Sequence, residues 1–397
     1  MQVARKPNKI SNSFIAKVLC LVEKGTLLAT VGHSESEYYG GKKPGINADI
    51  HFNDPSCIKQ IATRGDIGLG EAYMSGQIET TNLPALLTML LENVDYFEKY
   101  FHGNWLAKFI TNFAHNMNKN TKVGSKNNIK KHYDLGNEFY DLWLDDTMTY
   151  SSGIFLNECD LKAAQVNKYQ QILNNLPSKP QHILEIGCGW GGFAEFAAKA
   201  GHSVTAITIS NEQFQYCQDR HKSSGFDKVI DTKFLDYRNL QGQYDAIVSI
   251  EMIEAVGKEY WSEYMSTINK SLKKDGIAII QAITISDSEF EPYLKRTDFI
   301  QKYIFPGGTL PCPTKLHQVA QKNGLILSGR LQFGESYVKT LECWLKRFDS
   351  AYDNVKALGF DDEFIRMWRF YLAYCIAGFS VGRTDVSQFT YTKATGV

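Results

Sequence analysis

Apolar residues between positions 182 and 285 come in short runs separated by segments with helical periodicity. This alternation predicts strands joined by helices, and therefore a mostly parallel sheet with right-handed crossovers. The pattern predicts an α/β, Rossmann-like fold with a seven-stranded sheet. The expected strands are His182–Ile186, Val204–Ile209, Lys233–Leu235, Ala246–Ile250, Ile277–Ile283, Ile326–Phe333 and Gln388–Lys393. The expected helices lie near 165–176, 191–200, 211–222, 259–273, 340–350 and 361–377.

The first 117 residues show a mixed pattern that predicts a smaller α/β domain. The apolar faces of its last two helices could pack in a core or rest on lipid. Residues 118–131 are polar and basic, which predicts an exposed linker between a domain at 1–117 and a second domain at 132–397. The expected N-terminal elements are helices at Ser11–Glu23, Cys57–Arg64, Leu83–Tyr100 and Trp105–Met117, strands at Thr26–Val31 and Ala48–Asn53, and a loop at Tyr39–Gly45.

An apolar run that ends in an acid leads directly into a glycine turn at Ile183–Gly192, and a helical pattern follows. Strand, glycine turn and helix together bind nucleotide-like cofactors at the carboxyl edge of a doubly wound sheet. The spacing is G-x-G-x-G, without the pyrophosphate fingerprint, and it favours S-adenosylmethionine over a dinucleotide. Glu185 would then face the cationic sulfonium and ammonium groups. The alternative is an ordinary turn without a ligand. Several glycines would weaken a turn that does not need them, because glycine loses the most conformational freedom on folding.

Polar residues after the later strands are candidates for the rest of this site. No acid ends the second strand, where dinucleotide folds hold the ribose, and Thr208 and Gln213 are near that position. Asp236 follows the third strand and either suits an adenine amino group or caps a turn. Glu251 and Glu254 follow the fourth strand, where a substrate would meet the cofactor. One of them could be a cap, but two unpartnered carboxylates at this edge would be costly.

Composition narrows the class of protein. The 397-residue chain has a formal net charge of zero, so its totals show no nucleic-acid footprint. The eight cysteines are scattered without metal-binding spacing, which favours reduced thiols in the cytosol and no metal site. The N-terminus lacks the apolar core of a secretory signal. No apolar run approaches the roughly 20 residues that span a bilayer, so membrane contact is expected to be peripheral.

Several motifs together resemble those of the cyclopropane-fatty-acyl-phospholipid synthase family, in its long form with an N-terminal domain. The glycine motif is shared with many methyltransferases, whereas the segments at 132–137, 150–152 and 303–308 are far more specific. The resemblance implies the fold of a class I S-adenosylmethionine-dependent methyltransferase. The matching segments are His132–Asn137, Met148–Ser152, Leu184–Gly192, Ile207–Ser210, Glu251–Gly257, Lys302–Gly308 and Tyr337–Leu341, with Gly65–Gly76 in the N-terminal domain.

This resemblance implies methyl transfer from S-adenosylmethionine to the cis double bond of an unsaturated phospholipid acyl chain. An alkene is a weak nucleophile, so it needs a dry pocket and close alignment with the methyl group. Transfer leaves a carbocation, which aromatic faces can stabilise, and aromatic residues make up 13% of the chain. Loss of a methyl proton then closes a cyclopropane ring. Such enzymes are expected to be cytoplasmic, to meet lipid at the membrane surface and to form homodimers.

In the enzymes that the chain resembles, a bound bicarbonate takes this proton, and its ligands map onto Ser152, Glu254, Gln281, Ile283 and Tyr337. Ser152 and Gln281 stand where the family has a cysteine and a histidine. Both can hydrogen-bond an anion, but Gln281 cannot carry charge or relay a proton. These departures keep a second outcome open, in which the cation loses a proton from carbon. The product is then a methylene branch, and a methyl branch after reduction.

The resemblance also assigns the cofactor contacts. Tyr133 would belong to a segment that covers the site, or else be a buried structural tyrosine. The chain could also be a lipid-binding protein without activity or a methyltransferase for a small polar acceptor. The expected cofactor-binding residues are Tyr133, Tyr150, Ser151, Gly187, Gly189, Thr208, Gln213 and Asp236.

Overall fold

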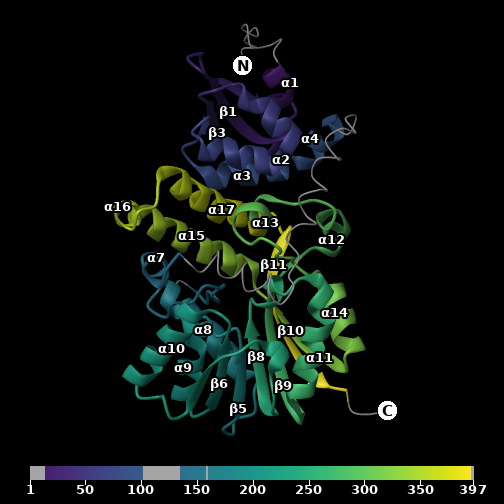
Figure 1. The fold of residues 1–397 in the computed structure, drawn as a ribbon. Coiled ribbons are helices and arrows are strands. Elements are labelled where there is room, and N and C mark those ends of the chain that lie inside the picture. Colours follow the sequence, from purple (N-terminus) through teal and green to yellow (C-terminus); the bar gives the residue numbers. More distant parts are fainter. Residues whose placement is uncertain (1–13, 102–134, 158–159, 395–397) are drawn as a thin grey trace. The chain divides into compact units, whose positions relative to one another are not determined.

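The computed structural model describes residues 14–101, 135–157 and 160–394 (Figure 1). The chain divides into two compact units, each built from segments that are distant in sequence. Unit 1 comprises residues 1–113 and 359–381, and unit 2 comprises residues 114–358 and 382–397. The expected linker at 118–131 and the expected helix at Trp105–Met117 lie outside the described residues.

Unit 2 contains the seven-stranded sheet that the apolar pattern predicted. Its strand order is β10-β11-β9-β8-β5-β6-β7. Strands β9, β8, β5, β6 and β7 are parallel, and β11 runs antiparallel to both β9 and β10. This is the α/β fold expected for a class I methyltransferase. The strands are β5 (His182–Ile186), β6 (Ser203–Thr208), β7 (Ile230–Phe234), β8 (Tyr244–Ile250), β9 (Leu272–Ile285), β10 (Leu325–Gln332) and β11 (Thr384–Lys393).

Helices cover both faces of this sheet because successive strand residues point to opposite sides. Ile183 packs in a cluster with α8 (Leu161–Asn174), α9 (Gly192–Lys199) and α10 (Asn211–Ser223). Leu184 packs in a second cluster with α11 (Trp261–Ser271) and α14 (Pro313–Lys322). The buried strands therefore lie in a three-layer arrangement, visible in the lower part of Figure 1.

The remaining helices of unit 2 are short, apart from α15. The segment at 286–325 holds three helices before β10. The elements are α7 (Asn137–Asp141), the 3-10 helices η2 (Tyr237–Asn239), η3 (Ile253–Ala255) and η4 (Lys258–Tyr260), α12 (Asp287–Tyr293), α13 (Phe299–Tyr303), α15 (Gly334–Ser350) and α16 (Tyr352–Ala357).

Unit 1 is built on a four-stranded mixed sheet with the order β2-β1-β3-β4. The segment expected as a loop at Tyr39–Gly45 instead contributes to β2 and β3, with Gly40 (φ 90°) and Gly41 (φ 77°) making the turn between them. Pairing with β1 supplies the backbone hydrogen bonds that this turn-rich sequence did not suggest. The elements are α1 (Phe14–Leu19), β1 (Lys24–Val31), β2 (Glu37–Gly40), β3 (Lys43–Phe52), α2 (Cys57–Met74), β4 (Ile78–Glu79), α3 (Leu83–Glu92) and α4 (Val94–Phe101).

Helix α17 (Asp362–Ser380) belongs to unit 1, although the expected second domain ran without interruption from 132 to 397. It packs on α2 and α3. Arg366 donates to the backbone carbonyl of Tyr73 and forms an ion pair with Glu79 (2.9 Å). The Tyr374 hydroxyl donates to Asp66 (2.9 Å). Removing residues 1–117 would therefore expose a helix face that is buried in the intact chain.

Asn93 explains why the single helix expected at Leu83–Tyr100 is broken into α3 and α4. Its side chain is fully buried and accepts hydrogen bonds from the backbone N–H groups of Glu23 and Lys24, both at 2.9 Å. The same side chain donates to the carbonyl oxygens of Lys24 and Met89, also at 2.9 Å. One amide thus joins the end of α3 to the start of β1.

Asn93→Ala is expected to lower the free energy of unfolding by about 2–4 kcal/mol, because buried backbone groups lose their partners. Urea unfolding followed by circular dichroism measures this loss. Asn82→Ala is the matched comparison, since Asn82 is exposed and caps α3 through a single bond to the Ala85 N–H (3.0 Å). Equal losses for the two variants would contradict a special role for the buried amide.

Candidate active site

A cavity lies at the carboxyl ends of β5, β6 and β8 in unit 2. The chain runs from β5 to β6 and β7 and then returns to β8 on the other side of β5, so strand order reverses there. Open α/β sheets bind their ligands at such a reversal. Sequence-predicted residues that line the cavity are Tyr150, Ser151, Glu185, Gly187, Gly189, Thr208, Gln213, Asp236 and Glu251.

The glycine turn between β5 and α9 requires glycine on geometric grounds. Gly187 has φ 80°, and a Cβ there would lie 2.8 Å from Met252 Cγ. Gly191 has φ 81°, and a Cβ there would lie 2.6 Å from His221 Nε2. Backbone in this conformation admits larger residues only with strain. The turn can therefore bring its backbone close to a ligand at the cavity floor.

Glu185 is a buried acid at the end of β5. Its Oε2 atom has no hydrogen-bond partner among the described residues, although the side chain is only 3% exposed. Burial raises the pKa of this carboxyl well above its usual range, while the charge of Lys168 opposes the rise. A cationic ligand in the cavity would supply the missing partner, so Glu185 fits the ammonium or sulfonium of S-adenosylmethionine.

The polar residues beyond β6 and β7 have different surroundings. Thr208 donates to Gln213 Oε1 (2.8 Å), and both line the cavity. Asp236 also lines it, but its two carboxylate oxygens bind the Arg238 guanidinium at 2.9 and 2.6 Å. Asp236 also accepts from the Arg238 N–H (3.0 Å) at the start of η2. These contacts match the capping role that was the alternative to adenine binding.

Lys168 is a fully buried cation that the sequence-based prediction did not include. Its Nζ donates to Ser151 Oγ (2.6 Å), and Gln165 Nε2 donates to the Ser151 carbonyl (2.9 Å). Both side chains come from α8 and hold the segment that lines the cavity. Burial lowers the pKa of Lys168 to about 7, against the charges of Glu251, Asp145 and Glu185, which raise it.

Aromatic rings surround Tyr150. Its ring centroid lies 5.3 Å from Trp344, 5.4 Å from Trp143 and 5.5 Å from Tyr140. Trp190, which also lines the cavity, lies 4.9 Å from Tyr140. Trp344 belongs to α15, so this helix contributes to the aromatic surroundings of the site, while the aromatic residues of α17 belong to unit 1.

The Glu251 carboxylate joins three of the residues predicted for the bicarbonate site. Its Oε1 accepts hydrogen bonds from the backbone N–H of Ser152 (2.9 Å) and from Gln281 Nε2 (2.7 Å). Its Oε2 accepts one from the Tyr337 hydroxyl (2.7 Å). Gln281 lies nearby because it pairs with Ile250 between β8 and β9. The Ser152 hydroxyl donates instead to the Gly153 carbonyl (2.9 Å), so it does not contact this carboxylate.

Glu254 and Ile283 form a separate contact. Glu254 Oε1 accepts from the Ile283 N–H, whereas its buried Oε2 has no partner among the described residues. Burial, reinforced by the nearby charge of Glu251, raises the pKa of Glu254 to about 8. The two acids therefore have different roles. Glu251 accepts from several donors, and Glu254 is the group that most readily holds a proton.

Bicarbonate does not fit the residues that were predicted to bind it. The three donors on Ser152, Gln281 and Tyr337 already bind Glu251, and a second anion beside that carboxylate would be repelled. The five residues also divide between Glu251 and Glu254. The expectation of a bicarbonate ligated by all five residues stays a prediction that these contacts do not support.

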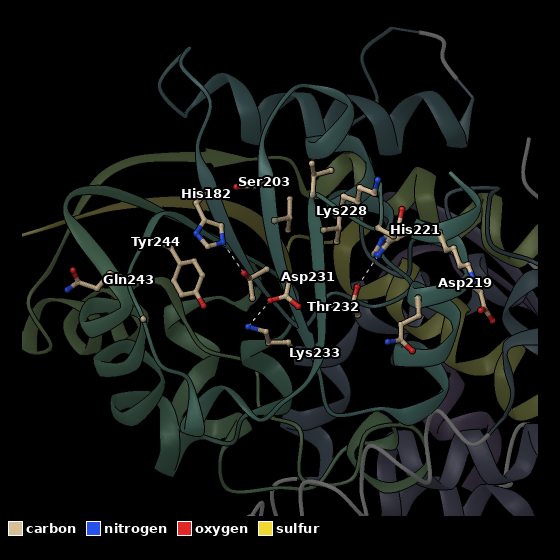
Figure 2. A pocket seen from close by; sticks show the side chains of 18 residues that line it. His182, Ser203, Asp219, His221, Lys228, Asp231, Thr232, Lys233, Gln243 and Tyr244 are labelled. Carbon is tan, nitrogen blue, oxygen red and sulfur yellow. Dashed lines mark hydrogen bonds and ion pairs between the residues drawn. The ribbon is translucent and has the colours of Figure 1, made fainter. Parts of the chain in front are cut away.

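Figure 2 shows a second pocket, at the amino ends of the same strands. Its lining includes the first residues of three strands, His182, Ser203 and Tyr244. His182 bonds to Thr205 (2.9 Å), and Lys233 pairs with Asp231 (2.7 Å), so these polar groups have partners. None of the sequence-predicted site residues lines this pocket. The cavity at the carboxyl ends of β5, β6 and β8, where the strand order reverses, is therefore the candidate active site.

Comparison with known proteins identifies the family of the chain. The family model described as mycolic acid cyclopropane synthetase matches residues 120–389, which is more than half of the chain. The chain belongs to this family. A second family model, described as a domain of unknown function, matches residues 26–100. Together the two matches correspond to the long form with an N-terminal domain.

Relatives in this family extend over nearly the full length of the chain. The tuberculostearic acid methyltransferase UfaA1 of Mycobacterium tuberculosis is 33% identical over 99% of this chain and 94% of its own length. The cyclopropane-fatty-acyl-phospholipid synthase of Escherichia coli is 32% identical over 87% of this chain and 88% of its own length. Their names describe two different outcomes of fatty-acyl methylation.

Solved structures of the family match about two thirds of the chain. Mycolic acid cyclopropane synthase CmaA1 complexed with SAH and CTAB aligns with a TM-score of 0.63 at 29% identity, over 68% of this chain and 98% of that one. The cyclopropane synthase MmaA2 from Mycobacterium tuberculosis aligns with a TM-score of 0.64 at 28% identity. These matches confirm the methyltransferase fold.

Two residues of the site were missed or undervalued. Glu251 was paired with Glu254 as an acid but not assigned to the catalytic set. Lys168 could have been found, because it falls on the buried stripe of α8 with Leu161, Ala164 and Ile172. Tyr133 lies outside the described residues. Across residues 14–101, 135–157 and 160–394, no helix is long and apolar enough to span a bilayer, and no acid, histidine or cysteine cluster suits a metal ion.

Proposed function

We propose that the protein transfers a methyl group from S-adenosylmethionine to the cis double bond of an unsaturated phospholipid acyl chain, and that a cyclopropane ring forms. The observation that carries the proposal is one cavity that joins the glycine turn and Glu185 to Glu251 and an aromatic wall. Tyr150, Ser151, Gly187 and Gly189 would hold the methionine end of the cofactor. Thr208 and Gln213 would meet its ribose or adenine.

The surroundings of Tyr150 suit a reaction that passes through a cation. An alkene gains little from a base before transfer, so the protein must mainly exclude water and align the acceptor with the methyl group. After transfer, the positive charge lies on the acyl chain. Aromatic faces near Tyr150 and Trp190 would stabilise that charge without acting as nucleophiles.

A second candidate outcome is a methylene branch, formed when a hydride moves from the methylated carbon to the cationic carbon before the transferred methyl group loses a proton. The likeness to the tuberculostearic acid methyltransferase over nearly the whole chain favours keeping it. Ring and methylene products have the same mass, so mass alone does not separate them. The two outcomes share the cofactor, the double bond and the first cation, and differ in whether a hydride shift precedes the loss of the methyl proton.

Incubation with S-adenosylmethionine and phospholipid vesicles tests the function. We expect S-adenosylhomocysteine to form with vesicles of unsaturated phospholipid and not with saturated ones. Proton NMR of the extracted lipid should show the upfield signal of a ring methylene. An olefinic methylene signal in its place would assign the branching outcome.

The same assay distinguishes lipid methylation from methylation of a small polar acceptor and from lipid binding without activity. Turnover of a small polar acceptor without vesicles would point to the wider methyltransferase fold. Cofactor binding without any S-adenosylhomocysteine would point to a lipid-binding protein. Either result would contradict the proposal.

Unit 1 is proposed to help the enzyme contact the membrane surface, together with the basic segment at 118–131. Basic side chains near anionic lipid each contribute about 1 kcal/mol of attraction. Because α17 packs in unit 1, substitutions in the basic segment are a cleaner probe than deletion of residues 1–117. A homodimer, which the family resemblance implies, also stays a proposal.

A further inference from the structure

We propose that the Glu251 carboxylate is the general base of the reaction and takes the position of a bound bicarbonate. This inference rests on the proposed methyl transfer and assigns the acceptor of the proton that the cation loses. The chain would then carry its own base and require no exogenous anion.

The contacts of Glu251 support this assignment. Carboxylate and bicarbonate each present two oxygens on a planar carbon, so both suit the same convergent donors. The donors are the Ser152 N–H and Gln281 Nε2 on one oxygen and the Tyr337 hydroxyl on the other. They come from a loop, a strand and a helix that are distant in sequence. Only the folded structure brings these three donors together around Glu251.

The backbone of Glu251 gives an independent reason. Glu251 has φ 49°, one of three left-handed non-glycine residues among those described. Such a conformation costs about 1 kcal/mol or more and persists where surrounding contacts impose it. The backbone N–H of Glu251 donates to the Gln281 carbonyl (2.8 Å), which anchors the turn after β8. The strained turn places Glu251 at the cavity wall.

The charges around Glu251 permit it to ionise although it is half-buried. Burial raises the pKa of its carboxyl, while the Lys168 charge and the Tyr337, Gln281 and Ser152 donors lower it. Glu254 is harder to ionise, because the charge of Glu251 and burial both raise the pKa of its carboxyl. When one of the two acids is ionised, these contacts favour Glu251.

The proposed step balances in atoms and charge. The methyl group leaves the sulfonium with its bond to sulfur broken, and the alkene π electrons form the new C–C bond. For ring closure, a C–H bond of the transferred methyl group then breaks, and its electrons join the methyl carbon to the cationic carbon. For the methylene branch, a hydride first moves from the methylated carbon to the cationic carbon, and the electrons of a methyl C–H bond then form the methylene double bond. The proton goes to a Glu251 oxygen and is returned to solvent after the product leaves.

Glu251→Gln is the first test. The amide keeps the shape of the side chain and can still accept from Ser152 and Gln281, so the variant should fold and bind S-adenosylmethionine in calorimetry. Its rate of lipid methylation should fall by about 100-fold or more, which is typical for loss of a general base. Glu291→Gln, an exposed acid on α12, is the matched control and should keep the wild-type rate. A Glu251→Gln rate near wild type would overturn the proposal.

Removal of bicarbonate from the assay is the second test. Wild-type activity should be the same in degassed buffer and after addition of bicarbonate. Glu251→Gly relieves the left-handed strain and removes the carboxylate that accepts from the three donors, which makes room for an anion. Its low activity should therefore rise several-fold with added bicarbonate. Stimulation of the wild type by bicarbonate to the same extent would overturn the proposal.

A binding measurement separates this inference from the proposed function. In ¹³C NMR, labelled bicarbonate should exchange with a bound state in Glu251→Gly and show no bound state in the wild type. This result does not depend on lipid turnover. Failure of the wild type to methylate unsaturated vesicles would contradict the function alone, whereas bicarbonate bound to the wild type would contradict the position assigned to Glu251.

Discussion

Lys168→Met is expected to lower kcat/KM at about pH 7 by about 10- to 100-fold and to shift the ascending limb of the pH–rate profile to higher pH. The charge of Lys168 lowers the pKa of the half-buried Glu251 carboxyl. Without that charge, Glu251 keeps its proton to higher pH, and a smaller fraction of the enzyme holds an ionised base. Initial rates of lipid methylation between about pH 6 and 9 measure both effects.

Lys162→Met is the matched control for this prediction. Lys162 lies on the same helix, α8, and pairs with Asp146 (2.8 Å) at the surface. Its loss should leave the profile unchanged, because exposed ion pairs contribute little. If Lys168→Met lowers the rate equally at every pH, its effect comes from the lost bond to Ser151, and the electrostatic role is contradicted.

The sheet of unit 2 was predictable because its strands are buried on both faces and appear as apolar runs. All seven expected strands are present, and the largest differences lie at strand ends. The strand expected at Lys233–Leu235 begins three residues earlier, at Ile230. The polar residues Asp231 and Thr232 interrupt the apolar pattern there, while parallel pairing with β6 extends the strand.

The partner of α17 was not predictable from the sequence. Its apolar face is plain in the pattern and predicted a helix at 361–377, but an amphipathic face does not say which other element covers it. The structure shows that it packs on α2 and α3, about three hundred residues earlier in the chain. A prediction that divides the chain into consecutive segments cannot assign a late helix to the first domain.

In the candidate site, too, the sequence predicted which residues are present but not which of them contact one another. The glycine motif and the acids after β8 were identified because their spacing carries the signal. The distinction between Glu251 and Glu254 depends on the left-handed turn at Glu251, which no spacing rule predicts for a non-glycine residue. The family resemblance directed attention to Glu254, whereas the hydrogen bonds converge on Glu251.

Glu254→Gln should change how stability depends on pH. The pKa of Glu254 in the folded protein is about 8, above its ordinary value of 4.5. Between these values the folded state binds more protons at this site than the unfolded state. The contribution of Glu254 is therefore complete below about pH 4.5 and is lost as pH rises toward 8, by about 4 kcal/mol.

Glutamine does not titrate, so the variant should not lose this stability. The free energy of unfolding of Glu254→Gln minus that of the wild type should increase by about 4 kcal/mol from pH 4.5 to 8. Urea unfolding at four or five pH values measures this difference. Glu185 and Glu251 also have raised pKa values and change the stability of both proteins in the same direction, so the subtraction removes their contributions. The exposed control Glu291→Gln should show no such trend. A difference independent of pH would mean that Glu254 is ionised in the folded protein, and that its Oε2 atom has a partner.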